Sequence, residues 1–291
     1  MNQYNYEKWT TEDVLMTPFV KWVGGKRQVI DKYLKDKIPS FNRYVEPFAG
    51  GAAMFLHLKP KEAIINDLNE ALINGFLAIQ NEPYALMRKL DSFAKKHSEE
   101  FYNKMRTRKF RKTSSIAAQL IYLNKTCFNG MYRVNSNGFF NVPLNKDTLL
   151  KPKRMYDTNN ITALNVYFNT AKVEFTSKDY LITLDNAKSG DFVFCDPPYD
   201  YDQSEKSFVE YTKSGFNQED QKKLAQKLLE LDKKGVKWLL TNHDTKLIRE
   251  LYQSDDAHIK LEPMTTNRFI NSDSTKRVAT GKEIMVYNYE I

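Results

Sequence analysis

The chain has few of the residues on which several large protein classes depend. Only two cysteines, Cys127 and Cys195, occur among 291 residues, too few for a disulfide framework or a cysteine-rich metal site. The four histidines, at positions 57, 97, 243 and 258, are scattered without the spacing of metal ligands. We therefore expect no metal. We expect both thiols to be buried, small apolar side chains in a reducing, cytoplasmic location.

Long hydrophobic runs are also missing. No apolar stretch approaches the ~20 residues that a membrane-spanning helix needs. The first 17 residues are polar, include Glu7, Glu12 and Asp13, and lack the apolar core of a signal peptide. The chain nevertheless has 41% hydrophobic and 13% aromatic residues, enough for a packed core. We expect a folded protein with no membrane partner.

Two nucleotide-binding fingerprints are incomplete. The segment 19–27 resembles a phosphate loop, but the Gly-x-x-x-x-Gly-Lys-Ser/Thr spacing is absent, and Arg27 stands where a magnesium-binding hydroxyl is needed. The three-glycine dinucleotide fingerprint is missing as well. These absences argue against a nucleoside triphosphatase and against a dinucleotide enzyme. Lys21 and Lys26, with Trp22 beside them, are instead suited to hold a carboxylate and to stack on adenine.

Positive charge is concentrated in the middle of the chain. The net charge is +8, yet residues 84–155 alone contain 16 lysines and arginines and 4 acidic residues, a net charge of +12. The remaining residues therefore carry a net charge of −4. Solvated helix faces would explain such a block, but it is also typical of a nucleic-acid-binding insertion, which we favour.

The chain on either side of this block has the alternating pattern of an α/β fold. Short apolar runs predict buried strands at 44–45, 63–65, 192–195 and 236–240. Helical spacing predicts helices at 53–58, 218–234 and 245–252. Two alternating segments predict an antiparallel edge pair joined by a long polar loop, at 258–264 and 283–289. Within the basic block, residues 84–123 have helical spacing, and residues 124–152 are rich in loop-forming and aromatic residues.

The tetrapeptide Asp196-Pro197-Pro198-Tyr199 directly follows the apolar run 192–195. A buried strand that ends in an acidic residue places a carboxylate at the carboxyl edge of a sheet. The two prolines supply carbonyls without N–H donors and make the chain leave as a rigid, extended loop. Hydrogen-bond acceptors beside an aromatic face suit an exocyclic amine on a flat ring, with the ring stacked on Tyr199.

A second motif combines a glycine turn with an acidic residue. Residues 48–52, Phe48-Ala49-Gly50-Gly51-Ala52, follow one predicted strand, and Asp67 ends the next. A ligand can approach glycine backbone closely, and the carboxylate can accept hydrogen bonds from ribose hydroxyls. The motif alone is weak. It is also explained by a tight turn at Gly50 and by Asp67 capping a helix.

Three elements in this order resemble the Dam-type DNA N6-adenine methyltransferases, the D12 class of the alpha group: residues 19–26, 46–52 and 196–199. The segments 128–133 and 140–143 resemble the family's DNA-reading region, and residues 241–244 also fit the family. The similarity runs over nearly the whole chain from Phe19. Ala52 departs from the glycine of many relatives, and residues 144–147 depart from the usual glycine- and arginine-bearing stretch, which puts phosphate contacts there in doubt.

The resemblance implies a Rossmann-like methyltransferase sheet, mostly parallel with an antiparallel edge hairpin, and an inserted helical DNA-recognition domain. We expect an N-terminal extension at 1–17, a catalytic domain at 18–70 and 160–291, and a target-recognition domain at 71–159. The implied methyl donor is S-adenosylmethionine, and the implied substrate is double-stranded DNA, at GATC sites with base flipping. The sequence does not say whether a restriction endonuclease accompanies the enzyme.

The resemblance also implies roles for single residues. Asp196, Pro197 and Tyr199 would hold the flipped adenine. S-adenosylmethionine would be bound by Trp22, Lys26, Phe48, Gly50, Asp67, Asp179 and Asp196. Lys21, Arg133 and Pro143 would read bases. Phe128, Asn129 and Met131 would wedge into the duplex or fill the gap left by the flipped base. Arg133 could instead pair with an acid, and Phe128 and Met131 could be core residues, but the Asn-Gly turn between those two predicts an exposed tip. We expect His243 to be a loop or capping residue.

Two other functions remain possible at this point. An amino methyltransferase acting on RNA or on protein glutamine would use a related tetrapeptide. A catalytically silent DNA-binding module would explain the basic block but not Asp67 or residues 196–199. The basic insertion and the segment from Arg133 to Pro143 favour an enzyme that acts on duplex DNA.

Overall fold

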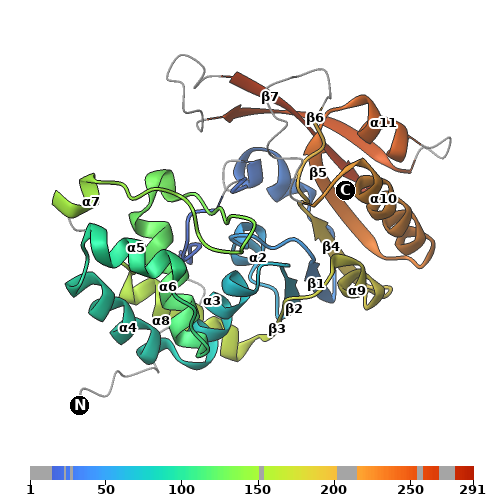
Figure 1. Cartoon of the computed structure of the whole chain (residues 1–291). Helices are drawn as coiled ribbons and strands as arrows, with labels where there is room; N and C mark the ends of the chain where they lie inside the picture. Colours follow the sequence, from blue (N-terminus) through green and yellow to red (C-terminus); the bar gives the residue numbers. More distant parts are fainter. Residues whose placement is uncertain are drawn as a thin grey trace. The chain divides into compact units, whose positions relative to one another are not determined.

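The computed structural model of the chain describes residues 15–22, 24–26, 29–150, 154–201, 215–253, 258–268 and 279–291. These residues form two compact units, each built from two stretches of chain. Unit 1 contains the described residues of Met1–Lys26 and Ala49–Ser177, and unit 2 contains those of Arg27–Phe48 and Lys178–Ile291. Both units contain helices and strands (Figure 1). No helix in the described part of the chain is long and apolar enough to cross a membrane.

Unit 2 is built on five strands in the order β1-β4-β5-β7-β6. Their bounds are β1 Arg43–Glu46, β4 Asp191–Cys195, β5 Lys237–His243, β6 Lys260–Arg268 and β7 Ala279–Tyr287. β1, β4 and β5 run parallel, whereas β7 is antiparallel to β5 and β6 is antiparallel to β7. The helical elements are η2 Ile30–Leu34, η3 Lys35–Lys37, α9 Tyr180–Asp185, α10 Gln218–Lys233 and α11 Lys246–Tyr252.

Strand β4 lies at the centre of unit 2, between β1 and β5. Every residue of β4 is buried, which explains why its sequence is a nearly continuous apolar run rather than an alternating one. Helix α10 buries Leu224, Leu228 and Leu231 along one side, and an Asn217–Asp220 capping box defines its start. The residues that follow β4 therefore extend from a rigid core.

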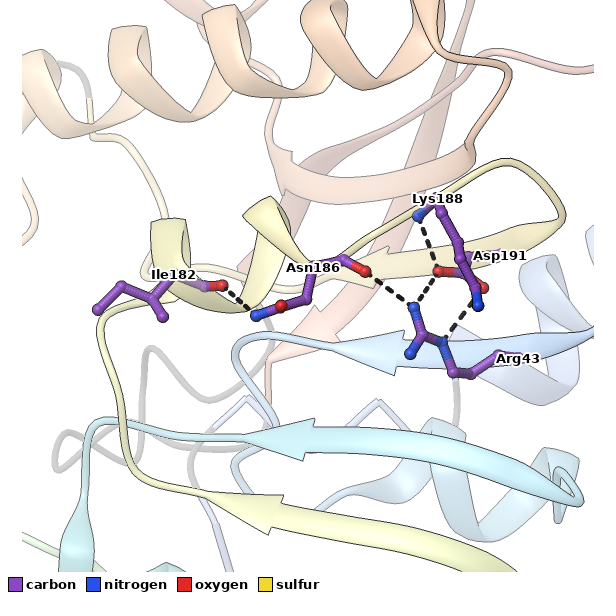
Figure 2. Close-up of polar contacts among 5 residues, drawn as sticks. All are labelled: Arg43, Ile182, Asn186, Lys188 and Asp191. Carbon is purple, nitrogen blue, oxygen red and sulfur yellow. Dashed lines mark hydrogen bonds and ion pairs between the residues drawn. The ribbon is translucent and has the colours of Figure 1, made fainter.

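An ion pair at the amino-terminal ends of β1 and β4 aligns these two strands. Arg43 Nη2 lies 2.6 Å from Oδ2 of Asp191, whose side chain is 1% exposed, and it also donates to the Asn186 carbonyl (Figure 2). The Lys188 backbone N–H donates to the same carboxylate. Arg43 and Asp191 are the first residues of their strands and are paired in the parallel register, so β1 and β4 begin side by side. β4 thus carries Asp196 to the carboxyl edge of the strands.

Unit 1 combines two strands with most of the helices. β2, Glu62–Asn66, pairs in parallel with β3, Lys172–Thr176. The helical elements are α2 Ala53–Leu58, α3 Glu70–Asn81, α4 Pro83–Lys95, α5 Glu99–Thr107, α6 Thr113–Thr126, η4 Phe128–Gly130, α7 Asp147–Leu150 and α8 Thr158–Thr170. The rings of Phe55, Phe76, Phe168 and Phe175 pack together in the core. Helix α6 is buried on most sides, and both α3 and α4 pack against it.

A glycine in α3, Gly75, leaves room for the ring that anchors the segment before Trp22. A Cβ atom on Gly75 would lie 2.5 Å from Cζ of Phe19, so only glycine leaves room for this ring. The Phe19 ring packs edge-on against Phe76, with centroids 4.9 Å apart. The Asn160 side chain bonds both the N–H and the carbonyl of Thr17. Residues 17–19 are therefore fixed on the core of unit 1.

The predicted fold class is confirmed: the chain is α/β, with mostly parallel pairing and an antiparallel pair at the edge. β5 extends to His243, beyond the predicted end at residue 240. The helical spacing of residues 84–123 corresponds to α4, α5 and α6. The recognition-domain boundaries 71–159 stay a prediction. The polar loop at 269–278 and most of the N-terminal extension, residues 1–14, lie outside the described residues.

Candidate active site

The acidic residue of the tetrapeptide lies at the carboxyl end of β4 and is partly exposed. Asp196 Oδ1 accepts a hydrogen bond of 2.7 Å from the Thr241 hydroxyl, which β5 places alongside. This bond fixes the direction of the carboxylate, whose oxygens are hydrogen-bond acceptors when ionised.

The two prolines differ in what their carbonyl oxygens do. Pro198 O accepts from Gln221 Nε2 at 2.8 Å, and Gln221 in turn accepts from Asn242 Nδ2 at 3.1 Å. Asn242 Oδ1 accepts from the Asp200 N–H at 2.9 Å, so α10 and β5 hold both sides of the loop. Among the described residues, no donor is bonded to the Pro197 carbonyl. Pro197 thus contributes a carbonyl acceptor in the residue that follows Asp196.

Tyr199 is fixed at its ring and at its hydroxyl. The hydroxyl donates to Glu283 Oε2 at 3.0 Å, and the ring meets the edge of His243 with centroids 4.7 Å apart. Burial raises the pKa of the Tyr199 phenol well above its ordinary value, and the charges of Asp196 and Glu283 raise it further. The phenol therefore stays protonated at neutral pH and acts as a donor.

His243 differs from the sequence prediction. It is the last residue of β5 and is buried, with Nδ1 donating to the Asp200 carbonyl at 2.6 Å. Its ring lies against the rings of both Tyr199 and Tyr201. The prediction of a loop or capping residue is wrong, because the imidazole packs under residues 196–201, which we call the β4 loop.

Two predicted cofactor residues of unit 2, Phe48 and Asp179, lie beside the same aromatic side chain. The Phe48 ring packs on Tyr180 with centroids 5.0 Å apart, and Phe216 meets both rings at 5.6 Å. Asp179 precedes Tyr180 and caps α9, accepting from the Leu181 N–H at 2.8 Å. Tyr180 and Phe216 were not singled out by sequence, because isolated aromatic residues carry no motif.

In unit 1, Asp67 lies at the end of β2 and binds the glycine turn. Its Oδ2 accepts from the Gly50 N–H at 2.9 Å, and its Oδ1 accepts from the Asn69 N–H at 2.8 Å. Burial raises the pKa of the Asp67 carboxyl, and the two N–H groups oppose that shift. The alternative in which Asp67 caps a helix is wrong, because Asn69 is the N-cap of α3.

Trp22 covers the glycine turn. Gly50 has φ of +49°, and a Cβ atom there would lie 2.8 Å from Cδ1 of Trp22. The indole also stacks on Tyr132, with centroids 5.3 Å apart and the ring planes inclined by 26°. Lys26 is buried, and its Nζ donates to the Gly24 carbonyl at 3.2 Å. Unit 1 thus brings Trp22, Gly50 and Asp67 together, but one face of the indole already has a stacking partner.

The predicted base-reading residues are organised by the end of α6. The Asn124 side chain accepts from the Lys21 N–H at 2.9 Å and donates to the carbonyls of Lys21 and Gly130, at 2.9 and 2.8 Å. A Cβ atom on Gly130 would collide with the Lys21 side chain, and the Met131 N–H bonds back to Phe128. One buried amide therefore connects Lys21 to the turn at 128–131. The sequence gives no signal for this role of Asn124.

Residues 128–143, which we call the recognition segment, include several exposed side chains. Phe128 is 44% exposed, and its N–H bonds the Pro143 carbonyl at 2.9 Å. Asn129 has φ of +54° and is exposed, which confirms the predicted exposed tip. Arg133 is also exposed, and its Nε donates to Asn141 Oδ1 at 2.8 Å. That bond uses the Nε donor and none of the terminal N–H groups of the guanidinium.

The basic block of unit 1 contains many exposed cations. Eleven exposed basic side chains lie on α4 and α5 and in the segments after them: Arg88, Lys95, Lys96, Lys104, Arg108, Lys109, Arg111, Lys112, Arg133, Lys146 and Arg154. Within the described part of the chain, none of these forms an ion pair with a carboxylate. Such a surface favours an anionic partner.

Ala52 ends the glycine turn in a conformation that favours glycine. Its φ and ψ are +54° and +40°, it is the N-cap of α2, and it is fully buried. The turn keeps its shape with alanine because Ala52 N–H bonds the Ala49 carbonyl at 2.6 Å.

Comparisons with known proteins identify the family. A profile of the D12 class N6 adenine-specific DNA methyltransferase matches residues 22–267. The type II methyltransferase M1.LlaDCHI of Lactococcus lactis subsp. cremoris is 36% identical, over 94% of this chain and 96% of that protein. The type II methyltransferase M.MjaIII of Methanocaldococcus jannaschii is 32% identical, over 94% and 99%. A DNA adenine methylase of Haemophilus influenzae is 30% identical, over 93% of each chain. The chain belongs to the D12 class of N6 adenine-specific DNA methyltransferases.

Proposed function

We propose that this DNA adenine methyltransferase transfers a methyl group from S-adenosylmethionine to N6 of adenine in double-stranded GATC sites, after flipping the adenine out of the duplex. The observation that carries the proposal is the pair of acceptors after β4. Thr241 orients the Asp196 carboxylate, and the Pro197 carbonyl beside it has no donor among the described residues. Two adjacent acceptors match the two hydrogens of an exocyclic amine.

The electronic state of the adenine amine determines what these residues must do. The N6 lone pair of adenine is delocalised into the ring, so the nitrogen is a poor nucleophile. Accepting its hydrogens at Asp196 and at the Pro197 carbonyl favours a pyramidal nitrogen with a localised lone pair. Asp196 is also placed to take the proton that leaves N6. Positioning and electrostatics then supply most of the acceleration.

S-adenosylmethionine supplies an electrophilic methyl group when bound, and the residues of unit 1 fit it. Each oxygen of the Asp67 carboxylate accepts one N–H, which leaves one further acceptor position on each for a ribose hydroxyl. The Gly50 turn provides backbone that a ligand can approach closely. We assign Trp22, Lys26, Gly50 and Asp67 of unit 1 to cofactor binding. We add Phe48, Asp179 and Asp196 of unit 2, as the family resemblance implies.

The recognition segment would recognise the DNA sequence. Arg133 has terminal N–H groups that can bond O6 and N7 of guanine. Lys21 is connected to the turn at 128–131 through Asn124, and Pro143 is connected to it through the Phe128 N–H. Phe128, Asn129 and Met131 form the turn that we assign to the space left by the flipped base. About 6 of the other exposed cations of the basic block would contact phosphates. Relatives named type II methyltransferases support a partnership with a restriction endonuclease that has the same site.

A methyl-transfer assay on matched duplexes tests the proposal. Purified protein is incubated with S-adenosylmethionine carrying a labelled methyl group and a duplex that contains one GATC site. The matched control duplexes carry purine, which lacks the amino group, in place of the target adenine on both strands, or a GTTC sequence. We expect label only on the GATC duplex. Transfer to the purine duplex would contradict N6 as the acceptor, and equal transfer to a duplex without GATC but with other adenines would contradict the recognition sequence alone.

The two alternatives from the sequence have distinct outcomes in the same assay. A protein glutamine or RNA methyltransferase would leave all DNA duplexes unlabelled and would still bind S-adenosylmethionine. A silent DNA-binding module would show no thermal shift with S-adenosylmethionine, because a ligand that does not bind the native state does not stabilise it.

A further inference from the structure

A buried carboxylate of β7 lies next to the β4 loop, and no role follows for it from the sequence. Glu283 is 8% exposed and sits directly opposite His243 in the antiparallel register of β5 and β7. Its Oε2 accepts the hydrogen bond of 3.0 Å from the Tyr199 hydroxyl. Removing a carboxylate from water is costly unless strong hydrogen bonds compensate. The phenol is therefore a main contact of this carboxylate and not an incidental neighbour.

The same bond fixes the aromatic ring in the β4 loop. A tyrosine ring pivots about two side-chain torsions, and a hydrogen bond at the hydroxyl end restricts both. The edge contact with His243 restricts the ring from the side, while His243 itself is held by the Asp200 carbonyl. Thr241 orients Asp196, and the charges of Asp196 and Glu283 both raise the pKa of the Tyr199 phenol. The acceptor and the stacking ring are therefore close enough to influence each other electrostatically.

We infer that Glu283 is a positioning residue for methyl transfer: it holds the Tyr199 ring for the target adenine and makes that ring richer in electrons. The inference rests on the proposed function of the β4 loop. A phenol that donates to a carboxylate carries more negative charge on its oxygen and ring than one that donates to a neutral group. An electron-rich aromatic face attracts a cation more strongly.

Positive charge develops on the adenine during the reaction. The N6 lone pair forms the new nitrogen–carbon bond, and the electron pair of the breaking carbon–sulfur bond stays on sulfur. One N6 proton then passes to the Asp196 carboxylate. Until the proton leaves, the base carries the charge that the sulfonium had carried. The Tyr199 ring is thus more useful to the transition state than to the neutral base, and Glu283 acts on kcat more than on KM.

The Glu283→Gln variant tests this role because an amide keeps the shape and one acceptor oxygen but loses the charge. We expect kcat to fall about tenfold, the difference between a hydrogen bond to a charged group and one to a neutral group. KM values for DNA and for S-adenosylmethionine should change by less than about twofold. In a Tyr199→Phe background, Glu283→Gln should produce no further loss, because the bond it modifies is already absent.

The matched control is Glu262→Gln. Glu262 of β6 accepts a hydrogen bond from the Tyr287 phenol and also pairs with Lys37, so this variant neutralises a carboxylate bonded to a tyrosine on the β6–β7 pair, away from the β4 loop. We expect its kcat to equal that of the wild type. Equal kcat for Glu283→Gln and Glu262→Gln would overturn the proposal. An undiminished loss in the Tyr199→Phe background would overturn it as well, since Glu283 would then act without Tyr199.

A spectroscopic measurement separates this proposal from the proposed function. With 3-fluorotyrosine at position 199, the ¹⁹F resonance should shift in Glu283→Gln and stay unchanged in Glu262→Gln, with or without substrates. No shift in Glu283→Gln would contradict a hydrogen bond between Tyr199 and Glu283 in solution and would overturn the proposal. A clear shift together with a wild-type protein that transfers no methyl group would refute the proposed function, and with it the catalytic role, while the contact itself would stand.

Discussion

The β4 loop and the recognition segment satisfy their polar groups in opposite ways. In the β4 loop, Thr241, Gln221 and Asn242 bond Asp196 and the backbone from inside unit 2. In the recognition segment the backbone is bonded internally and by side chains of α5 and α6, but the side chains of Phe128, Asn129 and Arg133 are exposed. A site that performs chemistry has to be preorganised, whereas a surface that recognises another molecule must keep its side chains available to contact that molecule.

The charged helices of the two units show the same contrast. On α10 the lysines pair with carboxylates of their own unit: Lys222 with Glu219, Lys223 with Asp220, and Lys227 with Asp185 and Glu230. On α4 and α5 the exposed cations have no such pairs within the described residues. Similar numbers of lysines thus make a solvated face in one unit and a surface for an anion in the other. Sequence charge counts alone do not distinguish the two.

The strongest test of the contrast is Asp196→Ala. Loss of the oriented carboxylate should reduce methyl transfer by roughly a thousandfold or more. Binding of GATC duplex should change little, because the exposed side chains of the recognition segment are untouched. Transfer assays and fluorescence anisotropy on the same preparation measure both effects. Retention of full turnover would contradict Asp196 as the amine acceptor, and a parallel loss of DNA binding would mean that the two regions are not separable.

The second test is Arg133→Ala, which should act on discrimination rather than on chemistry. We expect a loss of about 1–3 kcal/mol in discrimination for the guanine that the guanidinium contacts, and little change against duplexes already altered at that base pair. Arg88→Ala is the matched control, since it removes an exposed cation from α4 and should weaken all duplexes equally. Competition binding with single-base variants of GATC measures both. A uniform loss with Arg133→Ala would make it a phosphate contact.

The third test uses the salt dependence of DNA affinity to compare lysines at the end of α4 with lysines of α10 that have carboxylate partners. If about 6 cations contact phosphates, the logarithm of DNA affinity should fall against the logarithm of salt concentration with a slope near −5. Replacing both Lys95 and Lys96 with Gln should make that slope shallower by about 2. The same change at Lys222 and Lys223, which already have carboxylate partners, should leave it unchanged. Equal effects of the two pairs would remove the distinction between the helices.

The smallest effect is expected at Asn129, where backbone and side chain have separate roles. Its φ of +54° suits glycine, so Asn129→Gly should change the free energy of unfolding by less than about 0.5 kcal/mol. Asn129→Ala should destabilise the fold by about 1 kcal/mol, because alanine is strained in the left-handed region. Denaturant unfolding measures both. Both variants should weaken DNA binding, and unimpaired binding by Asn129→Gly would remove this side chain from the interface.

Much of the fold could be predicted because its signals are local. The apolar run before Asp196 and the glycine turn after β1 each specify a strand and its exit, and both are confirmed. The antiparallel pair of β6 and β7 also followed from alternation. The exposed tip at Asn129 followed from an Asn-Gly pair. Such features depend on neighbouring residues, so a single sequence contains them.

The supporting residues could not be predicted because they act across long sequence separations. Gln221 is one polar residue in a charged helix, and only the fold places it 2.8 Å from the Pro198 carbonyl. Glu283 lies 84 residues beyond Tyr199. Asn124 bonds Lys21 across 103 residues. His243 was assigned wrongly for the same reason, since nothing near it in sequence shows that its ring packs between two tyrosines.

The central claim is that the β4 loop and the recognition segment together methylate adenine at GATC. Single-molecule sequencing of DNA from a methylation-free host that expresses this chain tests it most directly, with the Asp196→Ala variant as the control. We predict N6-methyladenine at GATC for the wild type and none for the variant. Modification at a different motif would keep the chemistry and refute the assignment of Arg133 and Pro143. No modified adenine from a folded wild-type protein would contradict the account as a whole.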